Sequence, residues 1–73
     1  MMLSDVKDLP QKVRITQVCT RNRSRLLALG FIPGTIIEIV RQTSFGGPLL
    51  IIVRGTNVLL RAVPASLIEV ELL

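Results

Sequence analysis

The sequence contains no histidine and a single cysteine, Cys19. Because histidine and cysteine supply most ligands of tetrahedral zinc sites, one chain lacks the usual ligand set for zinc. The lack of histidine also excludes the Cys–His and Ser–His pairs of nucleophilic catalysis. No G-x-x-x-x-G-K-[ST] segment is present, which excludes a P-loop nucleotide site. The sequence therefore predicts a protein that is not an enzyme and has no catalytic, cofactor-binding or metal site.

Long apolar runs are also absent. The longest uninterrupted run, from Leu49 to Val53, is far shorter than the roughly 20 residues that span a bilayer. The segment from Met1 to Asp5 lacks the charged start and apolar middle of a signal peptide. A lone cysteine cannot form an internal disulfide, and it is interpreted either as core filler or as a partly exposed thiol. These features predict a cytoplasmic location.

Aromatic residues are scarce, since Phe31 and Phe45 are the only rings in 73 residues. A chain of this length is expected to form one domain, residues 1–73. A domain so small buries only about 60% of the surface that its unfolded chain exposes. Hydrophobic residues make up 49% of the sequence. The core is therefore expected to consist of leucine, isoleucine and valine.

Alternating or β-branched segments predict five short strands, at residues 13–16, 35–42, 49–54, 58–61 and 68–71. A tight turn at Gly55-Thr56-Asn57 would join the third and fourth strands in a hairpin. One short helix is expected at about residues 21–29, and a short helical turn near 64–66. Since five such strands are too few for two packed sheets, we predict a mainly β fold, a small SH3-like five-stranded β-barrel with one inserted helix.

The end of the inserted helix has a recognisable pattern. Gly30 follows the last apolar residue and is suited to the left-handed position that stops a helix. In that register Phe31 contacts Leu26, as in a Schellman ending. Pro33 and Gly34 then form a turn, because proline suits the first central position and glycine a positive φ.

This segment resembles the hallmark of the FeoA family, ferrous iron transport protein A, in which a basic residue and two leucines precede L-G-[LMF]-x-P-G-[TS]. Here residues 25–35 read Arg25-Leu26-Leu27-Ala28-Leu29-Gly30-Phe31-Ile32-Pro33-Gly34-Thr35. The downstream Val53-Arg54-Gly55, Val58-x-Leu60-Arg61 and Ile68-x-Val70 also fit in order. Within the motif we assign an architectural role to Leu26, Leu29, Gly30, Pro33 and Gly34.

The resemblance implies a small accessory or regulatory protein of ferrous iron uptake. Its partner would be FeoB, a membrane transporter for Fe²⁺ with its own GTPase domain, and it would reach the membrane only through that partner. The helix, the turn around Phe31 and the arginines Arg21, Arg23 and Arg25 would dock on the transporter. The same arginines have a second interpretation, a solvated basic turn.

A second candidate surface is apolar. Counting by twos along the third strand places Leu50 and Ile52 on the outer face, where FeoA-like sequences often carry charges. Leu59 on the neighbouring strand would lie beside them. Two interpretations remain open: the N-terminal segment, with Leu3, Val6 and Leu9, covers this patch, or the patch stays exposed for a partner or for self-association.

The charge balance leaves two alternative functions. With 9 basic and 5 acidic residues the chain carries a net charge of +4, which favours acidic partners or simply keeps an apolar protein dispersed. An SH3-like barrel with this charge could bind nucleic acid or act as a self-associating adaptor, including a homo-oligomer. No nucleic acid partner is expected, because the chain has no tyrosine or tryptophan on which bases would stack.

Overall fold

The computed structural model describes residues 1–21 and 23–73. Five antiparallel strands form one sheet in the order β4-β3-β2-β1-β5, which confirms the predicted mainly β fold. Their bounds are β1 Gln11–Val18, β2 Ile36–Gln42, β3 Leu49–Val53, β4 Thr56–Leu60 and β5 Ile68–Leu72. Three short helical elements complete the described chain: η1 Leu3–Asp5, α1 Arg23–Ala28 and α2 Ala62–Ala65.

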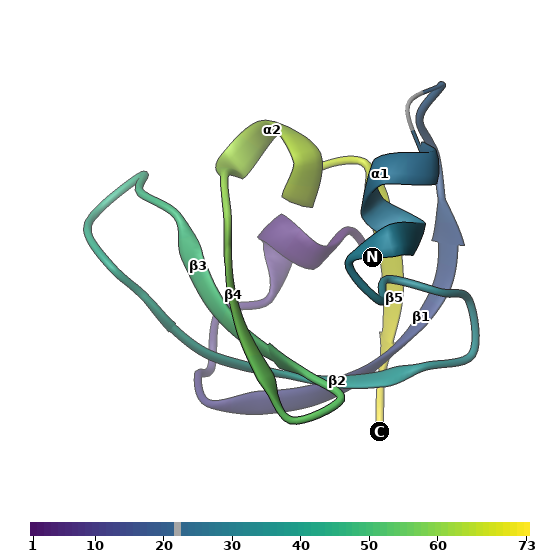
Figure 1. Ribbon diagram of the computed structural model, residues 1–73. Coiled ribbons are helices and arrows are strands. Elements are labelled where there is room, and N and C mark those ends of the chain that lie inside the picture. The colour runs from purple at the N-terminus through teal and green to yellow at the C-terminus, as the bar shows by residue number, and fades with distance from the viewer. Residues whose placement is uncertain (22) are drawn as a thin grey trace.

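The sheet is strongly curved (Figure 1). The register shifts between Ile15 and Gln17 in β1 and between Ile39 and Arg41 in β2, and such bulges bend a strand and increase its twist. No ladder joins the edge strands β4 and β5 within the described residues, so the barrel stays open on that side and α2 links the two strands. Both α1 and α2 lie at the same end of the curved sheet (Figure 1).

The concave face of the sheet carries the core. Alternate residues of each strand point inward, as the two-residue period of a β-strand requires. No buried side chain in the described part of the chain is polar or charged. Fully burying one such aliphatic side chain contributes about 1.5–3 kcal/mol. The residues with at most 2% exposure are Leu3, Val13, Ile15, Phe31, Ile37, Ile39, Ile51, Val53, Ala65, Ile68 and Val70.

The hairpin between β3 and β4 differs from the sequence prediction. Its loop is Arg54-Gly55, with φ angles of 51° and 76°, and Thr56 already pairs with Val53. The predicted turn at Gly55-Thr56-Asn57 was therefore wrong. A two-residue loop with two positive φ angles matches the right-handed twist of the flanking strands, which explains why the chain accepts a positive φ at an arginine.

The other elements agree with the predictions apart from their ends. The first strand, β1, is twice as long as the expected 13–16. Helix α1 ends at Ala28, one residue before the end of the expected 21–29, and residue 22 of that range lies outside the described residues. The helical turn predicted near 64–66 is α2, which begins at Ala62. No helix in the described part of the chain has the length and hydropathy to cross a membrane.

Helix α1 ends as the sequence predicted. The amide of Phe31 donates to the carbonyl of Leu26 at 3.0 Å, and the amide of Gly30 donates to the carbonyl of Leu27 at 3.0 Å. Gly30 has a φ of 103°. This pair of hydrogen bonds around a left-handed glycine is the Schellman motif. It turns the chain so that Phe31 enters the core with 0% exposure.

The Pro33-Gly34 turn then joins α1 to the sheet. The amide of Thr35 donates to the carbonyl of Ile32 at 3.0 Å, and Gly34 has a φ of 94°, as a type II turn requires. The amide of Gly34 donates to the carbonyl of Ile15 at 2.7 Å, and the amide of Ile15 donates to the carbonyl of Thr35 at 2.9 Å. The turn therefore hydrogen-bonds directly to β1 and holds α1 at a fixed place over the sheet.

Gly30 also lies against β3. A Cβ atom at this position would be 2.7 Å from Cγ1 of Val53, which is closer than carbon atoms pack. Val53 is 1% exposed and its β-branched side chain has few alternative rotamers. The absence of a side chain at position 30 is therefore what allows the end of α1 to pack on the sheet.

We predict that Gly30→Ala destabilises the fold more than Gly34→Ala. Both substitutions place a side chain on a left-handed backbone, which costs about 1–2 kcal/mol. Only Gly30→Ala adds a clash, worth about 1–3 kcal/mol more, since nothing lies within 4 Å of a Cβ at Gly34. Urea unfolding of the two variants measures the difference. Equal free energies of unfolding would contradict the close approach of Gly30 to Val53.

The two phenylalanines give a second prediction, because Phe31 is 0% exposed and Phe45 is 106% exposed. Phe31→Ala removes a fully buried ring and should lower the free energy of unfolding by about 3–5 kcal/mol. Phe45→Ala is the matched control and should change it by less than about 0.5 kcal/mol. Thermal and urea unfolding test both variants. A mild effect of Phe31→Ala would mean that the ring does not occupy the core.

Candidate functional site

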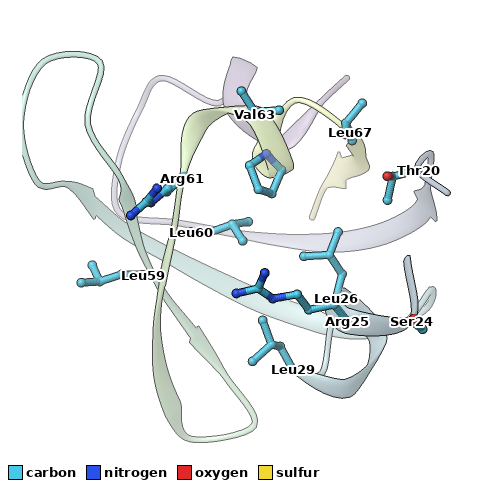
Figure 2. A pocket seen from close by; sticks show the side chains of 11 residues that line it. Thr20, Ser24, Arg25, Leu26, Leu29, Leu59, Leu60, Arg61, Val63 and Leu67 are labelled. Carbon is cyan, nitrogen blue, oxygen red and sulfur yellow. The ribbon is translucent and has the colours of Figure 1, made fainter. Parts of the chain in front are cut away.

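A groove lies between α1, the end of β4 and α2, with a volume of ≈ 690 Å³. Leu26 of α1 and Leu60 of β4 form its floor, and they are only 7% and 4% exposed. Figure 2 shows their side chains pointing toward each other across the hollow. The groove is thus open to solvent above the core that holds α1 against the sheet.

Three large apolar side chains on the walls of this groove remain exposed. Leu29, which follows α1, is 45% exposed, Leu59 of β4 is 61% exposed, and Val63 of α2 is 72% exposed. Single exposed aliphatic residues are ordinary on a protein surface, but a group around one hollow is typical of an interaction site. The three elements that meet here therefore supply an apolar surface that a partner would bury.

The charges of the groove have one sign. Arg25 and Arg61 line it, and no aspartate or glutamate is among its lining residues. In Figure 2 the Arg25 side chain reaches from α1 toward β4, whereas Arg61 comes off the far side of β4. The one ion pair found in the described part of the chain, between Arg14 and Glu71 at 3.0 Å, lies on β1 and β5. The arrangement favours a ligand that is partly apolar and carries negative charge.

The three arginines proposed from the sequence do not form one cluster in this groove. Arg21, Arg23 and Arg25 are all exposed, but only Arg25 lines the hollow. Arg23 is the first residue of α1. Their role in partner binding stays a prediction, and the structure separates Arg25 from the other two as the one next to exposed apolar side chains.

Phe31 is not available as a docking residue in this structure. Its ring was expected to contact a partner together with the helix, but it is 0% exposed and belongs to the core cluster. The physical reason is the Schellman ending, which directs the residue after the glycine back over the helix and into the protein. The architectural residues behave differently: Leu26 and Gly30 are buried, while Leu29 lies on the groove wall.

The predicted outer patch of β3 and β4 has the expected geometry. Leu50 pairs with Leu59 across the hairpin, and Ile52 lies two residues along β3. Leu50 and Ile52 are half-buried, and Leu59 is the exposed member. The N-terminal segment does not cover the patch, because Leu3 and Val6 lie in the core with the inward residues of β3. Leu59 thus belongs to both the patch and the groove.

Sequence reasoning missed part of this groove. It identified Arg25 and Leu59, but not Arg61, Val63 or Leu67 as site residues. Val63 and Leu67 could have been identified as a pair that brackets the predicted turn at 64–66, with one apolar side chain on each side. Their position beside α1 depends on the curvature of the sheet, and no local pattern encodes that.

Two further predictions about reactive groups can be compared with the structure. Cys19 is exposed, so the interpretation of Cys19 as core filler was wrong. No group of three or more His, Cys, Asp or Glu residues is placed to hold a metal ion in the described part of the chain. What the groove presents is apolar area and two guanidinium groups, which suit protein binding.

Relatives of known structure share this fold. The FeoA protein of Chlorobium tepidum is 28% identical with a TM-score of 0.89, covering 100% of this chain and 70% of that chain. Iron(II) transport protein A of Clostridium thermocellum is 34% identical with a TM-score of 0.89; the match covers 100% of this chain but only 46% of that one. FeoA of Stenotrophomonas maltophilia, a procaryotic SH3 domain protein complexed with zinc, is 30% identical with a TM-score of 0.82, and the match covers 97% of this chain and 89% of that chain.

The last of these relatives confirms the predicted SH3-like fold. The model of the FeoA domain matches residues 1–72. This match spans the Gly30 helix ending, the Pro33-Gly34 turn and the groove that they position. The chain therefore belongs to the FeoA family, the accessory proteins of ferrous iron transport.

Proposed function

We propose that this chain is a non-enzymatic regulator of ferrous iron uptake that binds the cytosolic part of FeoB through the groove between α1, β4 and α2. The observation that carries the proposal is the composition of the groove: exposed Leu29, Leu59 and Val63 next to Arg25 and Arg61, with no acidic residue. The chain would act in the cytoplasm and reach the membrane only through this transporter.

Binding energy would come mainly from the apolar walls. Burial of apolar area contributes about 25 cal/mol per Å², and interfaces rely on a few well-packed anchors near their centre. Leu26 and Leu60 form the floor and Leu29 lies beside it, so an inserted apolar side chain would pack on these three residues, while Leu59 extends the apolar surface on the other side of β4. Arg25 and Arg61 would pair with carboxylates of the partner and fix its orientation.

Regulation would follow from selective binding. GTPase domains in general alternate between conformations with the bound nucleotide. A ligand shifts such an equilibrium only by its difference in affinity for the two states. A groove held by the Schellman ending and the Pro33-Gly34 turn changes little on binding, so it would favour the partner conformation that already fits. The sign of the effect depends on which conformation that is.

The two alternative functions have less support. A surface that binds single-stranded nucleic acid relies on exposed aromatic side chains for stacking, and with Phe31 buried the only exposed ring is Phe45, in the loop between β2 and β3. Self-association through Leu50, Ile52 and Leu59 has a small apolar area to bury, because the first two are already half-buried. A protein partner at the groove accounts for more of the exposed apolar surface.

Chemical-shift mapping tests the proposed partner and locates the surface. Isotope-labelled chain would be titrated with the cytosolic domain of FeoB, with and without GTP. The proposal predicts the largest amide shifts in α1, β4 and α2, and small shifts on β1 and β5. Shifts absent from all residues, or confined to the β1 and β5 face, would overturn it.

Reversing the charge of one groove arginine, with a reversal outside the groove as control, tests the role of the groove's charge in binding. Arg25→Glu should weaken binding to the cytosolic domain about tenfold or more at low salt, because it places a carboxylate in a groove that selects negative charge. Arg23→Glu makes the same charge change on the same helix outside the groove and should weaken binding much less. Isothermal titration at two salt concentrations measures both. Equal losses for the two variants would show that only net charge matters.

A further inference from the structure

The two edges of the sheet are not equivalent. Beyond β5, the chain start pairs with the strand: Met2 bridges Glu69, and the amide of Val70 donates to the carbonyl of Met1 at 2.8 Å. Beyond β4, no segment in the described part of the chain pairs with the strand. One edge is therefore covered by the protein itself and the other is free.

The hairpin register tells which groups this free edge presents. A two-residue hairpin loop closes on a hydrogen-bonded pair, here Val53 and Thr56, and hydrogen-bonded and non-hydrogen-bonded pairs then alternate. The N–H and C=O groups of Thr56, Val58 and Leu60 consequently point toward β3 and pair with it. Asn57 and Leu59 direct their N–H and C=O groups away from β3, and both residues are exposed.

The free edge borders the groove. Leu59 and Leu60, the last two residues of β4, both line the hollow although successive residues of a strand point to opposite faces, and Arg61 directly after the strand lines it as well. A hollow that contacts two successive strand residues therefore reaches around the edge of β4 as well as one of its sides. Figure 2 shows this arrangement, with Leu60 pointing into the hollow toward Leu26 and Leu59 pointing to the other side of β4.

The edge also lacks the features that natural proteins use to block strand addition. The strand Thr56-Asn57-Val58-Leu59-Leu60 contains no charge and no proline, and its pairing with β3 is continuous without a bulge. Edges that must stay unpaired are usually protected by lysine, proline or a bulge. An unprotected edge next to an apolar groove is typical of binding by β-augmentation.

We infer that β4 receives an extended segment of the partner as a sixth strand, with acidic side chains of that segment meeting Arg25 and Arg61. This inference rests on the proposed function and specifies how the partner is recognised. The backbone of the segment would pair with Asn57 and Leu59. Its inward side chains would pack on Leu26 and Leu60. A hollow of ≈ 690 Å³ holds a segment of a few residues, since pockets of roughly 300–1,000 Å³ enclose a drug-sized ligand.

The charge of the groove selects this occupant over a second copy of the chain. A second copy would bring another β4, which carries no acidic residue to pair with the two arginines. An extended segment with apolar side chains over the floor and an acidic side chain on each of its faces, one near Arg25 and one near Arg61, satisfies the backbone edge, the apolar floor and the guanidinium groups together. No other described surface of the chain offers these three features at one place.

The test removes one backbone donor from the free edge. In Leu59→Pro the lost N–H is one that β3 does not use, so the hairpin keeps its ladder. Leu59→Ala is the matched control, because it trims the same side chain and keeps the N–H. The inference predicts that Leu59→Pro binds the cytosolic domain of FeoB about tenfold more weakly than Leu59→Ala does. Equal affinities of the two variants would overturn it.

Amide hydrogen exchange of the unaltered chain gives a second test that does not depend on a proline variant. On adding the cytosolic domain, the amides of Asn57 and Leu59 should gain protection from fast exchange, while those of Thr56 and Val58, already paired with β3, should change little. Binding at the groove without protection of Asn57 and Leu59 would exclude strand addition and leave the proposed function standing. No binding at all would overturn the proposed function, and the inference with it. Sedimentation showing a dimer that Leu59→Pro dissociates would assign the edge to a second copy instead.

Discussion

The contact between Gly30 and the β3 residue Val53 determines where the end of α1 meets the sheet, and α1 forms one wall of the groove. A Cβ at position 30 would approach Val53 to 2.7 Å, so the backbone at the end of α1 lies directly on the sheet. The Schellman hydrogen bonds and the turn at Pro33 and Gly34 then hold the helix there, and Phe31 anchors it in the core. Because α1 is only six residues long, it would not be stable alone and depends on these contacts.

The groove follows from this placement. With α1 fixed over one end of the curved sheet, α2 and the end of β4 form the other walls (Figure 1). The barrel is left open between β4 and β5, and that opening combines a free strand edge, exposed aliphatic side chains and charges of one sign. Under the proposed function, such a surface would recognise its partner by shape, backbone pairing and charge. This agrees with an accessory role in ferrous iron transport.

Local patterns in the sequence predicted the fold well. The Gly30 ending, the Pro33-Gly34 turn and the inward alternation of β2, β3 and β5 each depend on a few neighbouring residues, and all were predicted. The hairpin loop was misplaced because Arg54 adopts a positive φ that its side chain does not signal. The candidate site was predicted only in part. Arg25 and Leu59 stood out locally, but their grouping with Arg61 and Val63 depends on sheet curvature. Phe31 was expected to dock on a partner, although the predicted helix ending directs its ring into the core.

The most direct test of this account is a nuclear Overhauser measurement in solution between the α protons of Gly30 and the methyl groups of Val53. The account predicts strong cross-peaks in the free protein, because the two residues are in contact. It also predicts that the cross-peaks persist when the partner is bound, because the groove is preformed. Their absence from the free protein would show that α1 is not held on the sheet, and the groove described above would lose its basis.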